Sequence, residues 1–412
     1  MDGTSDHTMQ EQLLEREAEA SRFGPACRDI LFDVSRLVWR WWRGGLPTGV
    51  DRVCLAYMQH FRSRAKAVVQ RRGHHFVFDT AHSDRLFDLF CRGQMGFRSR
   101  FVPLAAGALL SGKQGPGERG QLYLNVGHTG LNEPSLPQWV KKHRLRAVYF
   151  VHDLIPLIHP QYCRRGEVDK HARRIENVLI SASGVIGNSQ AIIDELGAFA
   201  AQHRLRMPSA VAAPIAGPSV PDTLAPAVLE RPYFITVGTI EGRKNHILLL
   251  RIWERLARRY GPKSPLLLIV GQRGWEAAEA MAMLDRSDCL KEHVRELGSC
   301  TDAELANLIA GARALLMPSF AEGFGLPVAE ALQLGTPVLA SDLPVFREFA
   351  GDIPSYFDPL DGVGWERAIV SYIGESADRK RQREAIKNFL SPDWRSHFLV
   401  VDEWLKALPE RR

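Results

Sequence analysis

Between residues 233 and 340, short apolar runs alternate with segments of helical periodicity, and this alternation constrains the fold more than any other feature of the sequence. The apolar runs predict strands at residues 233–238, 265–271, 314–318 and 337–340. Helical patterns fill the intervals, and they lie at residues 247–259, 301–311 and 327–334. Strands that are apolar throughout and separated by helices form a parallel sheet covered on both faces.

The first half of the chain repeats this pattern less regularly. It predicts strands at residues 29–37, 121–126, 147–151 and 184–187, and helices at residues 48–64, 166–180 and 191–203. Between the halves, residues 207–232 contain six prolines, a composition that resists both helix and core strand and indicates a linker. The sequence therefore predicts two doubly wound α/β domains, in which ligands bind beyond the carboxyl ends of the strands.

A chain of 412 residues is too long for one core, which agrees with two domains of about 200 residues each. We expect a disordered N-terminus at residues 1–22, an N-terminal, acceptor-side domain at 23–215, a linker at 216–232 and a C-terminal, donor domain at 233–391. The first residues lack the apolar segment of a signal peptide, and no apolar stretch is long enough to span a bilayer. Six scattered cysteines fit a reducing cytoplasm.

The net charge is +6, and the basic residues gather in the first half, at residues 62–72, 92–100, 141–146 and 164–165. These clusters are either solvated surface or sites of contact with anionic lipid headgroups or an anionic acceptor. No helix-turn-helix, RRM or zinc-finger pattern accompanies them, so we expect no nucleic-acid partner.

Two loops that follow predicted strands of the second half carry candidate ligand-binding residues. The loop at residues 239–246 places Arg243 and Lys244 before a helix, where a guanidinium fork and an ammonium group suit phosphate oxygens. The alternative is a solvated pair of side chains. The next loop, at residues 271–275, offers Gly271 for close approach of a ligand and Trp275 for stacking or for packing.

The loop at residues 319–330 precedes a helix and contains two carboxylates, Glu322 and Glu330. Its backbone N–H groups at the helix N-terminus form an anion site; they belong to Gly323, Phe324, Gly325 and Leu326. A carboxylate near a helix N-terminus also has a purely structural explanation. Because a carboxylate repels phosphate, we expect the glutamates to bind hydroxyl groups while Arg243, Lys244 and the amides bind the phosphates. Hydroxyls on both sides of a diphosphate describe a nucleotide sugar.

Two loops of the first half are candidates for the opposite side of the site. His152 follows a predicted strand, and Asp153 is placed to orient it; a structural histidine is the alternative. The early loop at residues 40–52 is expected to follow a strand and to open a helix. Its glycines make it pliable, and its tryptophans and arginines suit either ligand binding or an aromatic patch; the glycines are Gly44, Gly45 and Gly49.

Residues 322–330 (EGFGLPVAE), followed by ALQLGTPVLASD at 331–342, resemble the donor-binding signature of the retaining glycosyltransferases of the glycogen-synthase-like superfamily. GRKNH at residues 242–246 and the segment at 152–160 (HDLIPLIHP) resemble bacterial polysaccharide mannosyltransferases of that group. The resemblance implies the GT-B fold: two Rossmann-like domains, a cleft between them, and a C-terminal helix that crosses back to the first domain, here at residues 392–405.

The resemblance also implies the roles of the site residues. Arg243 and Lys244 would bind the diphosphate, Glu330 the ribose hydroxyls and Glu322 the donor sugar, with His152 reaching the sugar from the opposite domain. The whole expected donor-binding set is Gly238, Thr239, Arg243, Lys244, Gly271, Phe324, Gly325, Leu326 and Glu330, and the catalytic set is Glu322, Arg243, Lys244 and His152. The acceptor side would contain Gly44, Gly45, Gly49 and Asp153. No metal or other cofactor is implied, and the sequence contains no D-x-D pair.

The sequence thus predicts a retaining glycosyltransferase that moves a hexose, with mannose favoured, from a nucleotide diphosphate sugar to a saccharide or lipid-linked saccharide in surface polysaccharide synthesis. GDP-mannose is the favoured donor. The expected location is the cytoplasm, with peripheral contact at the inner face of the membrane. A glycoside hydrolase or phosphorylase, and a non-catalytic nucleotide-sugar-binding protein, are the alternatives.

Overall fold

The computed structural model describes residues 28–45, 48–111, 115–116, 120–217, 220–221, 223–298 and 300–409. The chain forms two compact units, one of residues 1–149 with 410–412 and the other of residues 150–409. The expected disordered segment at residues 1–22 lies outside the described residues. The domain boundaries expected from the sequence remain a prediction.

The first sheet has seven strands in the order β3-β2-β1-β4-β5-β6-β7. Strand β1 pairs in parallel with β2 and β4, β4 with β5, and β6 with β7, whereas β2 and β3 form an antiparallel pair. Its strands are β1 (Ile30–Asp33), β2 (Ala65–Arg71), β3 (His74–Val77), β4 (Leu122–Asn125), β5 (Arg146–Val151), β6 (Ala182–Gly187) and β7 (Ser209–Ala212).

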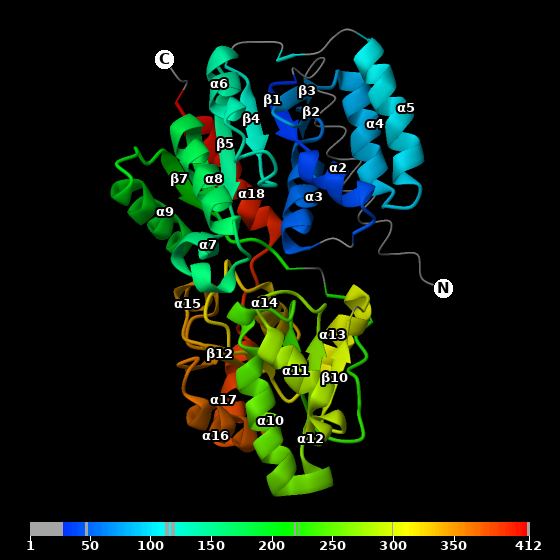
Figure 1. Cartoon of the computed structure of the whole chain (residues 1–412), viewed down its shortest axis with the longest axis vertical. Coiled ribbons are helices and arrows are strands. Elements are labelled where there is room, and N and C mark those ends of the chain that lie inside the picture. Colours follow the sequence, from blue (N-terminus) through cyan, green and yellow to red (C-terminus); the bar gives the residue numbers. More distant parts are fainter. Residues whose placement is uncertain are drawn as a thin grey trace. The chain divides into compact units, whose positions relative to one another are not determined.

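Helices connect the strands of the first sheet (Figure 1). They are α2 (Ser35–Trp42), α3 (Gly49–Phe61), α4 (Thr80–Cys91), α5 (Phe97–Leu110), α6 (Ser135–Lys142), α7 (Ile155–Ile158), α8 (Glu167–Ser181) and α9 (Gln190–Gln202), with a short 3-10 helix, η1 (Pro160–Tyr162). The predicted helices at residues 48–64, 166–180 and 191–203 are confirmed as α3, α8 and α9, with ends shifted by one to three residues.

Two predictions for the first half are wrong. The strand expected at residues 29–37 ends at Asp33, because the Asp33 carboxylate accepts the Ser35 N–H at 2.9 Å and α2 begins there. The early loop therefore follows helix α2 and not a strand. The segment at residues 207–232, expected to resist helix and core strand, contains β7, an edge strand whose backbone pairs with β6.

The second sheet confirms the parallel architecture predicted from the apolar runs. Its six strands are all parallel, in the order β10-β9-β8-β11-β12-β13. Its strands are β8 (Tyr233–Val237), β9 (Leu266–Val270), β10 (Val294–Leu297), β11 (Leu315–Met317), β12 (Val338–Ser341) and β13 (Ser355–Phe357). Its helices are α10 (His246–Tyr260), α11 (Ala278–Arg286), α12 (Asp288–Lys291), α13 (Asp302–Gly311), α14 (Leu326–Gln333), α15 (Pro344–Ala350), α16 (Gly362–Ile373) and α17 (Ala377–Ile386), with 3-10 turns η2 (Gly242–Lys244) and η3 (Gly261–Lys263).

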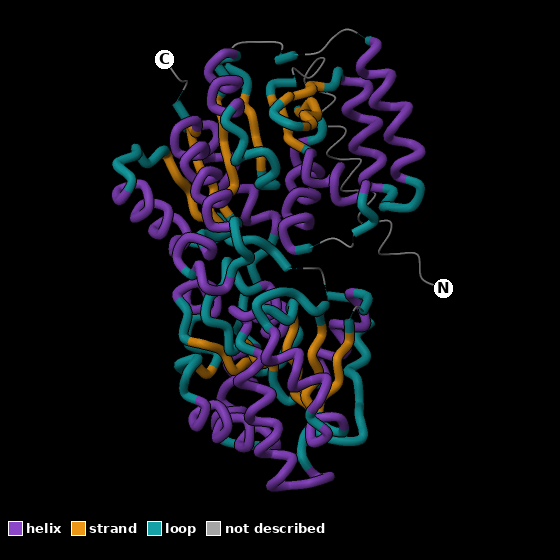
Figure 2. The backbone as a smooth tube through the Cα atoms, in the orientation of Figure 1, coloured by secondary structure: helices purple, strands orange, loops and turns teal. Residues whose placement is uncertain are grey.

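Helices cover both faces of the second sheet (Figure 2). Alternate residues of β8 point to opposite faces of the sheet and belong to two different hydrophobic cores. Tyr233 and Ile235 pack in the same core as Val328 of α14, whereas Phe234 packs in the other core with Trp253 of α10. Each such side chain is at most 2% exposed. Burying an aliphatic or aromatic side chain of this size contributes about 1.5–3 kcal/mol, so the two cores fix the strands on which the loops at the carboxyl edge depend.

The last helix, α18 (Trp394–Ala407), packs against strands β6 and β7 of the first sheet (Figure 1). A Cβ atom on Gly184 of β6 would lie 2.4 Å from Cη2 of Trp404, so the indole covers the bare backbone of the strand. The indole N–H also donates to Oγ of Ser209 in β7 at 3.1 Å. Such a C-terminal helix is what the GT-B resemblance implies.

We expect Gly184→Ala to lower the free energy of unfolding by about 1–3 kcal/mol, because its methyl group would displace Trp404 from a filled space. Gly197→Ala is the control: Gly197 lies in α9 with no atom within 4 Å of its added Cβ, so alanine should be neutral or stabilising by up to about 1 kcal/mol. Urea unfolding of the full chain measures both, and equal midpoints for the two variants would contradict the packing of α18.

Candidate active site

A buried carboxylate at the carboxyl edge of the second sheet joins two loops. Glu322, in the loop after β11, accepts hydrogen bonds from Nη1 of Arg243 at 2.8 Å and from Nζ of Lys244 at 2.5 Å. Ser319 Oγ donates to the same carboxylate at 2.7 Å. The two cations follow β8, and β8 and β11 are neighbours in the sheet, which is why residues 78 and 79 positions apart meet here.

The charges of this cluster lie largely out of water. The side chain of Glu322 is 6% exposed, that of Lys244 10% and that of Arg243 21%. Burial alone would raise the pKa of Glu322, but the charges of Arg243 and Lys244 and the hydrogen bonds from Lys244 and Ser319 hold it at about 2. Burial lowers the pKa of Lys244, although the Glu322 charge opposes this effect. Glu322 is therefore ionised at neutral pH and is not a general acid.

A second carboxylate, that of Glu241, pairs with the other side of the Arg243 guanidinium. Glu241 Oε1 lies 2.7 Å from Nη2 of Arg243, and Nη1 of Arg243 also donates to the carbonyl of Ala321 at 2.8 Å. The Glu322 and Glu241 charges raise the pKa of Arg243 against the effect of burial. Burial raises the pKa of Glu241, opposed by Arg243 and Lys244. Two cations thus face two carboxylates.

The backbone of the cationic loop is tied to the Glu322 loop independently of these charges. The Phe320 N–H donates to the carbonyl of Arg243 at 2.8 Å. Asn245, which adopts a left-handed conformation with φ of 55°, donates its amide to the carbonyls of Pro318 at 3.2 Å and Pro359 at 2.9 Å. These bonds fix where the side chains of Arg243 and Lys244 begin, so the cations are preorganised.

Two of the predicted donor-binding glycines meet beside the cations. A Cβ atom on Gly271 would lie 2.1 Å from the carbonyl oxygen of Gly238, and both residues have positive φ, 159° and 140°. The stem of Lys244 lies over Gly238, with Cε 3.1 Å from the position of an added Cβ. Thr239, the next predicted residue, contacts Gly274 of the neighbouring loop. Only glycine permits this approach of the loops after β8 and β9.

The N-terminus of α14 lies in the same loop as Glu322. Gly325 precedes the helix with φ of 99°, and a Cβ there would lie 2.2 Å from the ring of Phe346. Leu326 begins the helix, Pro327 has no N–H, and the Val328 N–H donates to the Gly325 carbonyl at 2.9 Å. The candidate anion-binding amides are therefore those of the residues up to Leu326, at the positive end of the helix dipole. The Phe324 ring stacks on Phe349 at 4.8 Å and is buried, so only its backbone is placed to meet a ligand.

The second predicted carboxylate, Glu330, lies on helix α14 and not in the loop that holds Glu322. It is the fifth residue of α14, and its Cγ lies 3.4 Å from the position of a Cβ on Gly217. Its predicted binding of ribose hydroxyls remains a prediction.

The backbone of His152 lies against Gly323, in the same loop as Glu322. A Cβ on Gly323 would lie 2.7 Å from the His152 carbonyl oxygen, which also accepts from Nδ2 of Asn188 at 3.1 Å. The imidazole is 5% exposed and lies 4.5 Å from the ring of Phe150, centroid to centroid. The Asp153 carboxylate accepts the N–H of Ile155 at 3.2 Å. The roles of His152 and Asp153 toward a ligand remain predictions.

The early loop belongs to the first unit. Gly44 has φ of 69°, Gly45 accepts a hydrogen bond from Gln94 at 2.8 Å, and Gly49 is the first residue of α3. Leu46 and Pro47 lie outside the described residues. The acceptor-side role of the three glycines remains a prediction.

A fully buried carboxylate organises the end of this loop. Asp51 forms a capping box with Thr48 and pairs with Arg36 at 2.6 Å and with Arg40 at 3.4 Å. Arg36 and Arg40 are therefore engaged by the protein itself.

Sequence reasoning missed Glu241, Ser319 and His246. The sequence did contain a signal for Glu241. It lies within four residues of Arg243 and Lys244 in one post-strand loop, and opposite charges so close together in the sequence indicate that they pair with one another. His246 is 3% exposed, and neither ring nitrogen has a hydrogen-bond partner. Burial, followed by the charge of Lys244, lowers the pKa of His246 to about 4, so it is neutral at pH 7.

Trp275, predicted either to stack on a ligand or to pack, is 36% exposed. The guanidinium of Arg164 lies 4.5 Å from the centroid of its ring, an arrangement typical of a cation–π contact. One face of the indole is therefore occupied by the protein, which favours packing.

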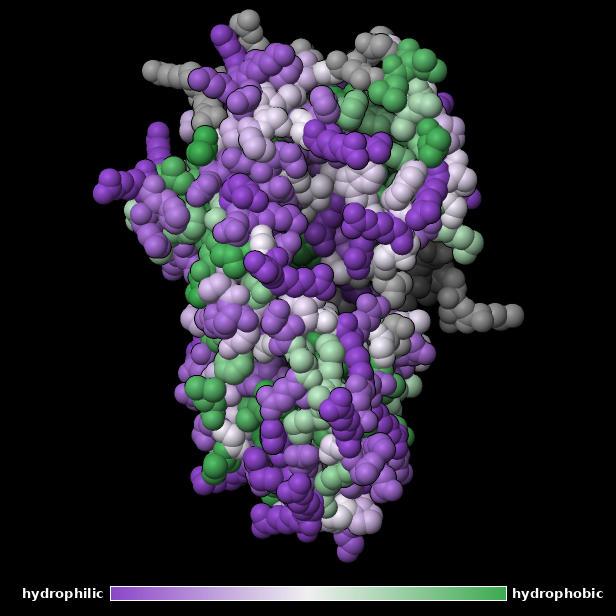
Figure 3. Space-filling model, viewed as in Figure 1, coloured by the Kyte–Doolittle hydropathy of each residue, from purple (hydrophilic) through white to green (hydrophobic). Residues whose placement is uncertain are grey.

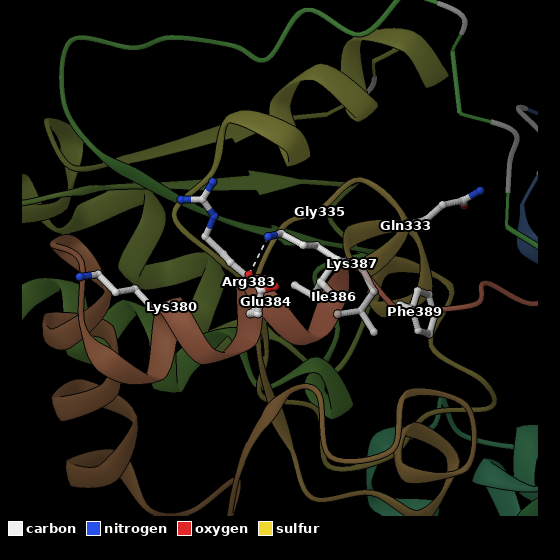
Figure 4. Close-up of a pocket in the computed structure, with 9 residues that line it drawn as sticks. Gln333, Gly335, Lys380, Arg383, Glu384, Ile386, Lys387 and Phe389 are labelled. Carbon is white, nitrogen blue, oxygen red and sulfur yellow. Dashed lines mark hydrogen bonds and ion pairs between the residues drawn. The ribbon is translucent and has the colours of Figure 1, made fainter.

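A cavity of about 620 Å³ lies away from the cluster, between the end of α14 and helix α17 (Figure 4). Its lining residues are Leu332, Gln333, Gly335, Lys380, Arg383, Glu384, Ile386, Lys387 and Phe389. Among the described residues, no group of three or more histidine, cysteine, aspartate or glutamate side chains is arranged to hold a metal ion.

Two Rossmann-like parallel sheets, with cations and a helix N-terminus at the carboxyl edge of the second, define the class of GT-B glycosyltransferases. Residues 225–389 match the family described as glycosyl transferases group 1. This part of the chain is therefore similar to the group 1 glycosyltransferases, the fold is GT-B, and the chain resembles the O-antigen mannosyltransferases.

Two curated relatives are mannosyltransferases of Escherichia coli. The serotype-specific mannosyltransferase WbdA is 29% identical over 279 residues, which are 64% of this chain and 33% of WbdA. The O-antigen chain mannosyltransferase B is 31% identical over 234 residues, which are 55% of this chain and 61% of that protein. The chain thus spans about a third of the length of WbdA and less than two thirds of the second relative.

A solved structure shows the same fold over nearly the whole chain. Anabaena HepE in complex with UDP-glucose aligns with a TM-score of 0.63 and 16% identity, covering 92% of this chain and 99% of HepE. The predicted GT-B fold is confirmed.

We expect Glu322→Gln to lower the free energy of unfolding at pH 7 by about 3 kcal/mol, because the pKa of Glu322 is held well below its unfolded value and Lys244 loses its charge partner. A depressed carboxyl pKa stabilises the fold above the unfolded pKa and ceases to do so as the pH falls through about 2. The difference between variant and wild type should therefore shrink from about pH 5 to about pH 2.

Glu384→Gln is the matched control, since Glu384 pairs with Lys387 at the surface, where both side chains are more than 60% exposed. Its effect should stay within about 0.5 kcal/mol. Chemical denaturation at several pH values measures both variants, and a constant difference for Glu322→Gln across the acid range would refute the assigned linkage.

Proposed function

We propose that this chain is a retaining glycosyltransferase that moves mannose from GDP-mannose to a saccharide or lipid-linked saccharide acceptor in surface polysaccharide synthesis. The observation that carries the proposal is the buried cluster of Arg243, Lys244 and Glu322 beside the N-terminus of α14. The printed names of the relatives favour mannose. The HepE structure contains UDP-glucose, so a protein of this fold accommodates a nucleotide sugar.

The cations fit a diphosphate leaving group. When a glycosyl–phosphate bond breaks, negative charge grows on the departing diphosphate, and preorganised donors aimed at that charge are the main source of catalysis. Arg243 offers a planar fork and Lys244 a compact charge. The diphosphate would replace Glu322 on Nη1 of Arg243 and on Nζ of Lys244, while the N–H groups at the start of α14 bind further phosphate or sugar oxygens.

The released carboxylate of Glu322 would then accept hydrogen bonds from hydroxyl groups of the donor sugar. Ser319, which donates to this carboxylate in the structure, keeps it in reach of the cluster. His152, held against Gly323 of the same loop, would contact the sugar from the other side. Glu330, one turn along α14, would bind the ribose hydroxyls.

Retention of configuration is proposed to arise from attack of the acceptor on the face that the diphosphate leaves. Retaining glycosidases use a carboxylate nucleophile, but in this proposal the Glu322 carboxylate accepts hydrogen bonds from Ser319 and from hydroxyl groups of the donor sugar and does not attack the anomeric carbon. No metal ion or other cofactor enters this proposal, because the leaving-group charge is met by Arg243 and Lys244.

The location proposed for the enzyme is the cytoplasmic face of a membrane. Helix α5 and the turn before it expose four large apolar side chains: Met95, Val102, Leu109 and Leu110. Figure 3 shows hydrophobic surface near the end of α5. Arg92, Arg98 and Arg100 are exposed beside the start of the helix. Apolar residues flanked by arginines suit an anionic lipid surface. No described helix combines the length and apolar character needed to cross a bilayer.

With GDP-mannose as the donor, we expect Arg243→Ala and Lys244→Ala each to lower the rate of transfer at least about tenfold, because each removes a donor to the leaving group. Arg251→Ala is the control, since Arg251 lies on α10 and pairs with Glu279 at the surface. Product formation with a panel of saccharide acceptors measures the rate, and circular dichroism verifies folding. Unchanged turnover in either variant would reject the phosphate assignment, and transfer from UDP-glucose instead of GDP-mannose would reject the proposed donor.

Neutralising the three arginines at the start of α5 and in the turn before it, as Arg92→Gln, Arg98→Gln and Arg100→Gln together, should weaken binding to vesicles that contain anionic lipid by about 100-fold, at about 1 kcal/mol per charge. A charge-matched variant, with Lys380, Arg383 and Lys387 of the α17 region changed to glutamine, should bind like the wild type. Vesicle co-sedimentation at two salt concentrations measures the affinities, and equal binding by all three proteins would refute this contact surface.

A further inference from the structure

Glu241 is the one charged residue of the loop at 239–246 for which the proposed function has no task. Its side chain is 4% exposed, and its Oε1 lies 2.7 Å from Nη2 of Arg243. On the other side of the guanidinium, Nη1 pairs with Glu322, which also pairs with Lys244. The two cations are therefore already neutralised by two carboxylates before a ligand arrives.

A diphosphate bound to these cations would change that balance. Its two negative charges would join the charges of Glu241 and Glu322 and exceed the positive charge of Arg243 and Lys244. Little water reaches this cluster to screen the repulsion, since the side chains are between 4% and 21% exposed. Like charges that share a poorly solvated site favour protonation of the weaker acid.

Glu241 is the weaker acid of the two. Without a ligand, Glu322 is held ionised by three donors, from Arg243, Lys244 and Ser319. With the sugar donor bound, it keeps the Ser319 hydroxyl and, in the proposed function, gains hydroxyl groups of the sugar. Glu241 is held by Arg243, and burial together with the Glu322 charge raises its pKa. The groups that face it are Arg243 and Lys244 from its own loop, Glu322 from the loop after β11, and Cys163 from the segment after η1.

We propose that Glu241 takes up one proton from solvent when the diphosphate of the sugar donor binds to Arg243 and Lys244. This inference rests on the proposed function. One carboxyl oxygen of Glu241 gains the hydrogen, and the other continues to accept the Nη2–H of Arg243, so the guanidinium keeps its position. Glu241 is a positioning residue in this scheme, because it acts on the donor through Arg243.

Proton uptake ties donor affinity to pH. Protonation is favoured at low pH, so the dissociation constant should increase as the pH rises, by up to about tenfold per pH unit while one proton is bound per donor. The diphosphate of a nucleotide sugar is a diester without a titratable group near neutral pH, so the protein must supply the site of uptake. His246, which faces Lys244 and Glu322, and Glu322 itself, once the diphosphate has taken its two cations, are the other groups of the cluster able to bind a proton.

Isothermal titration of the full chain with GDP-mannose tests the proposal when it is repeated at about pH 7 in buffers that differ in ionisation enthalpy. The wild type should take up between about half a proton and one proton. Glu241→Gln mimics the protonated side chain, so it should bind with no uptake and with an affinity that no longer depends on pH. Glu279→Gln, in a surface pair with Arg251, should behave like the wild type.

Binding by the wild type without proton uptake overturns the inference and leaves the proposed function intact. Uptake that persists in Glu241→Gln also overturns it and points to His246 or Glu322. If neither GDP-mannose nor any other nucleotide sugar binds, the proposed function and the inference fall together. The wild-type titration alone is decisive should Glu241→Gln fail to fold, since it gives the number of protons directly.

Discussion

The pairing of Glu322 with Arg243 and Lys244 is the interaction on which the candidate site depends. Removing charges of both signs from water is expensive, and such a pair is tolerated only where the geometry is good and further hydrogen bonds satisfy the carboxylate. Here Ser319 and the carbonyl of Ala321 complete the network. In the absence of a ligand Glu322 holds the cations in place, so a diphosphate meets donors that need little reorganisation.

The sheet makes this pairing possible through its order and its glycines. Strand β8 lies between β9 and β11, so the loop with the cations is flanked by the loops that follow both neighbours. Gly238 and Gly271 allow two of these loops to touch through bare backbone, and Asn245 ties the third. The site is therefore built from three post-strand loops that cannot shift independently.

The second sheet could be predicted from the sequence because strands buried on both faces read as continuous apolar runs. The first sheet was harder to predict from the sequence. Strand β7 lies in a proline-containing segment, and β1 ends at Asp33 because of a local hydrogen bond that the pattern of apolar residues does not indicate. The sequence analysis identified Arg243, Lys244 and Glu322 but treated them as separate ligand contacts. Their mutual pairing spans 78 and 79 residues and depends on the strand order, which composition and spacing do not encode.

The contact between Trp404 and Gly184 affects how the protein is made. Strand β6 is covered by α18, which is synthesised after all six strands of the second sheet. At a ribosome speed of about 5–20 residues per second, the roughly 200 residues in between take about 10 to 40 seconds to emerge. During that interval the bare backbone of β6 stays uncovered on the nascent chain, and we expect chaperones to occupy it until α18 arrives.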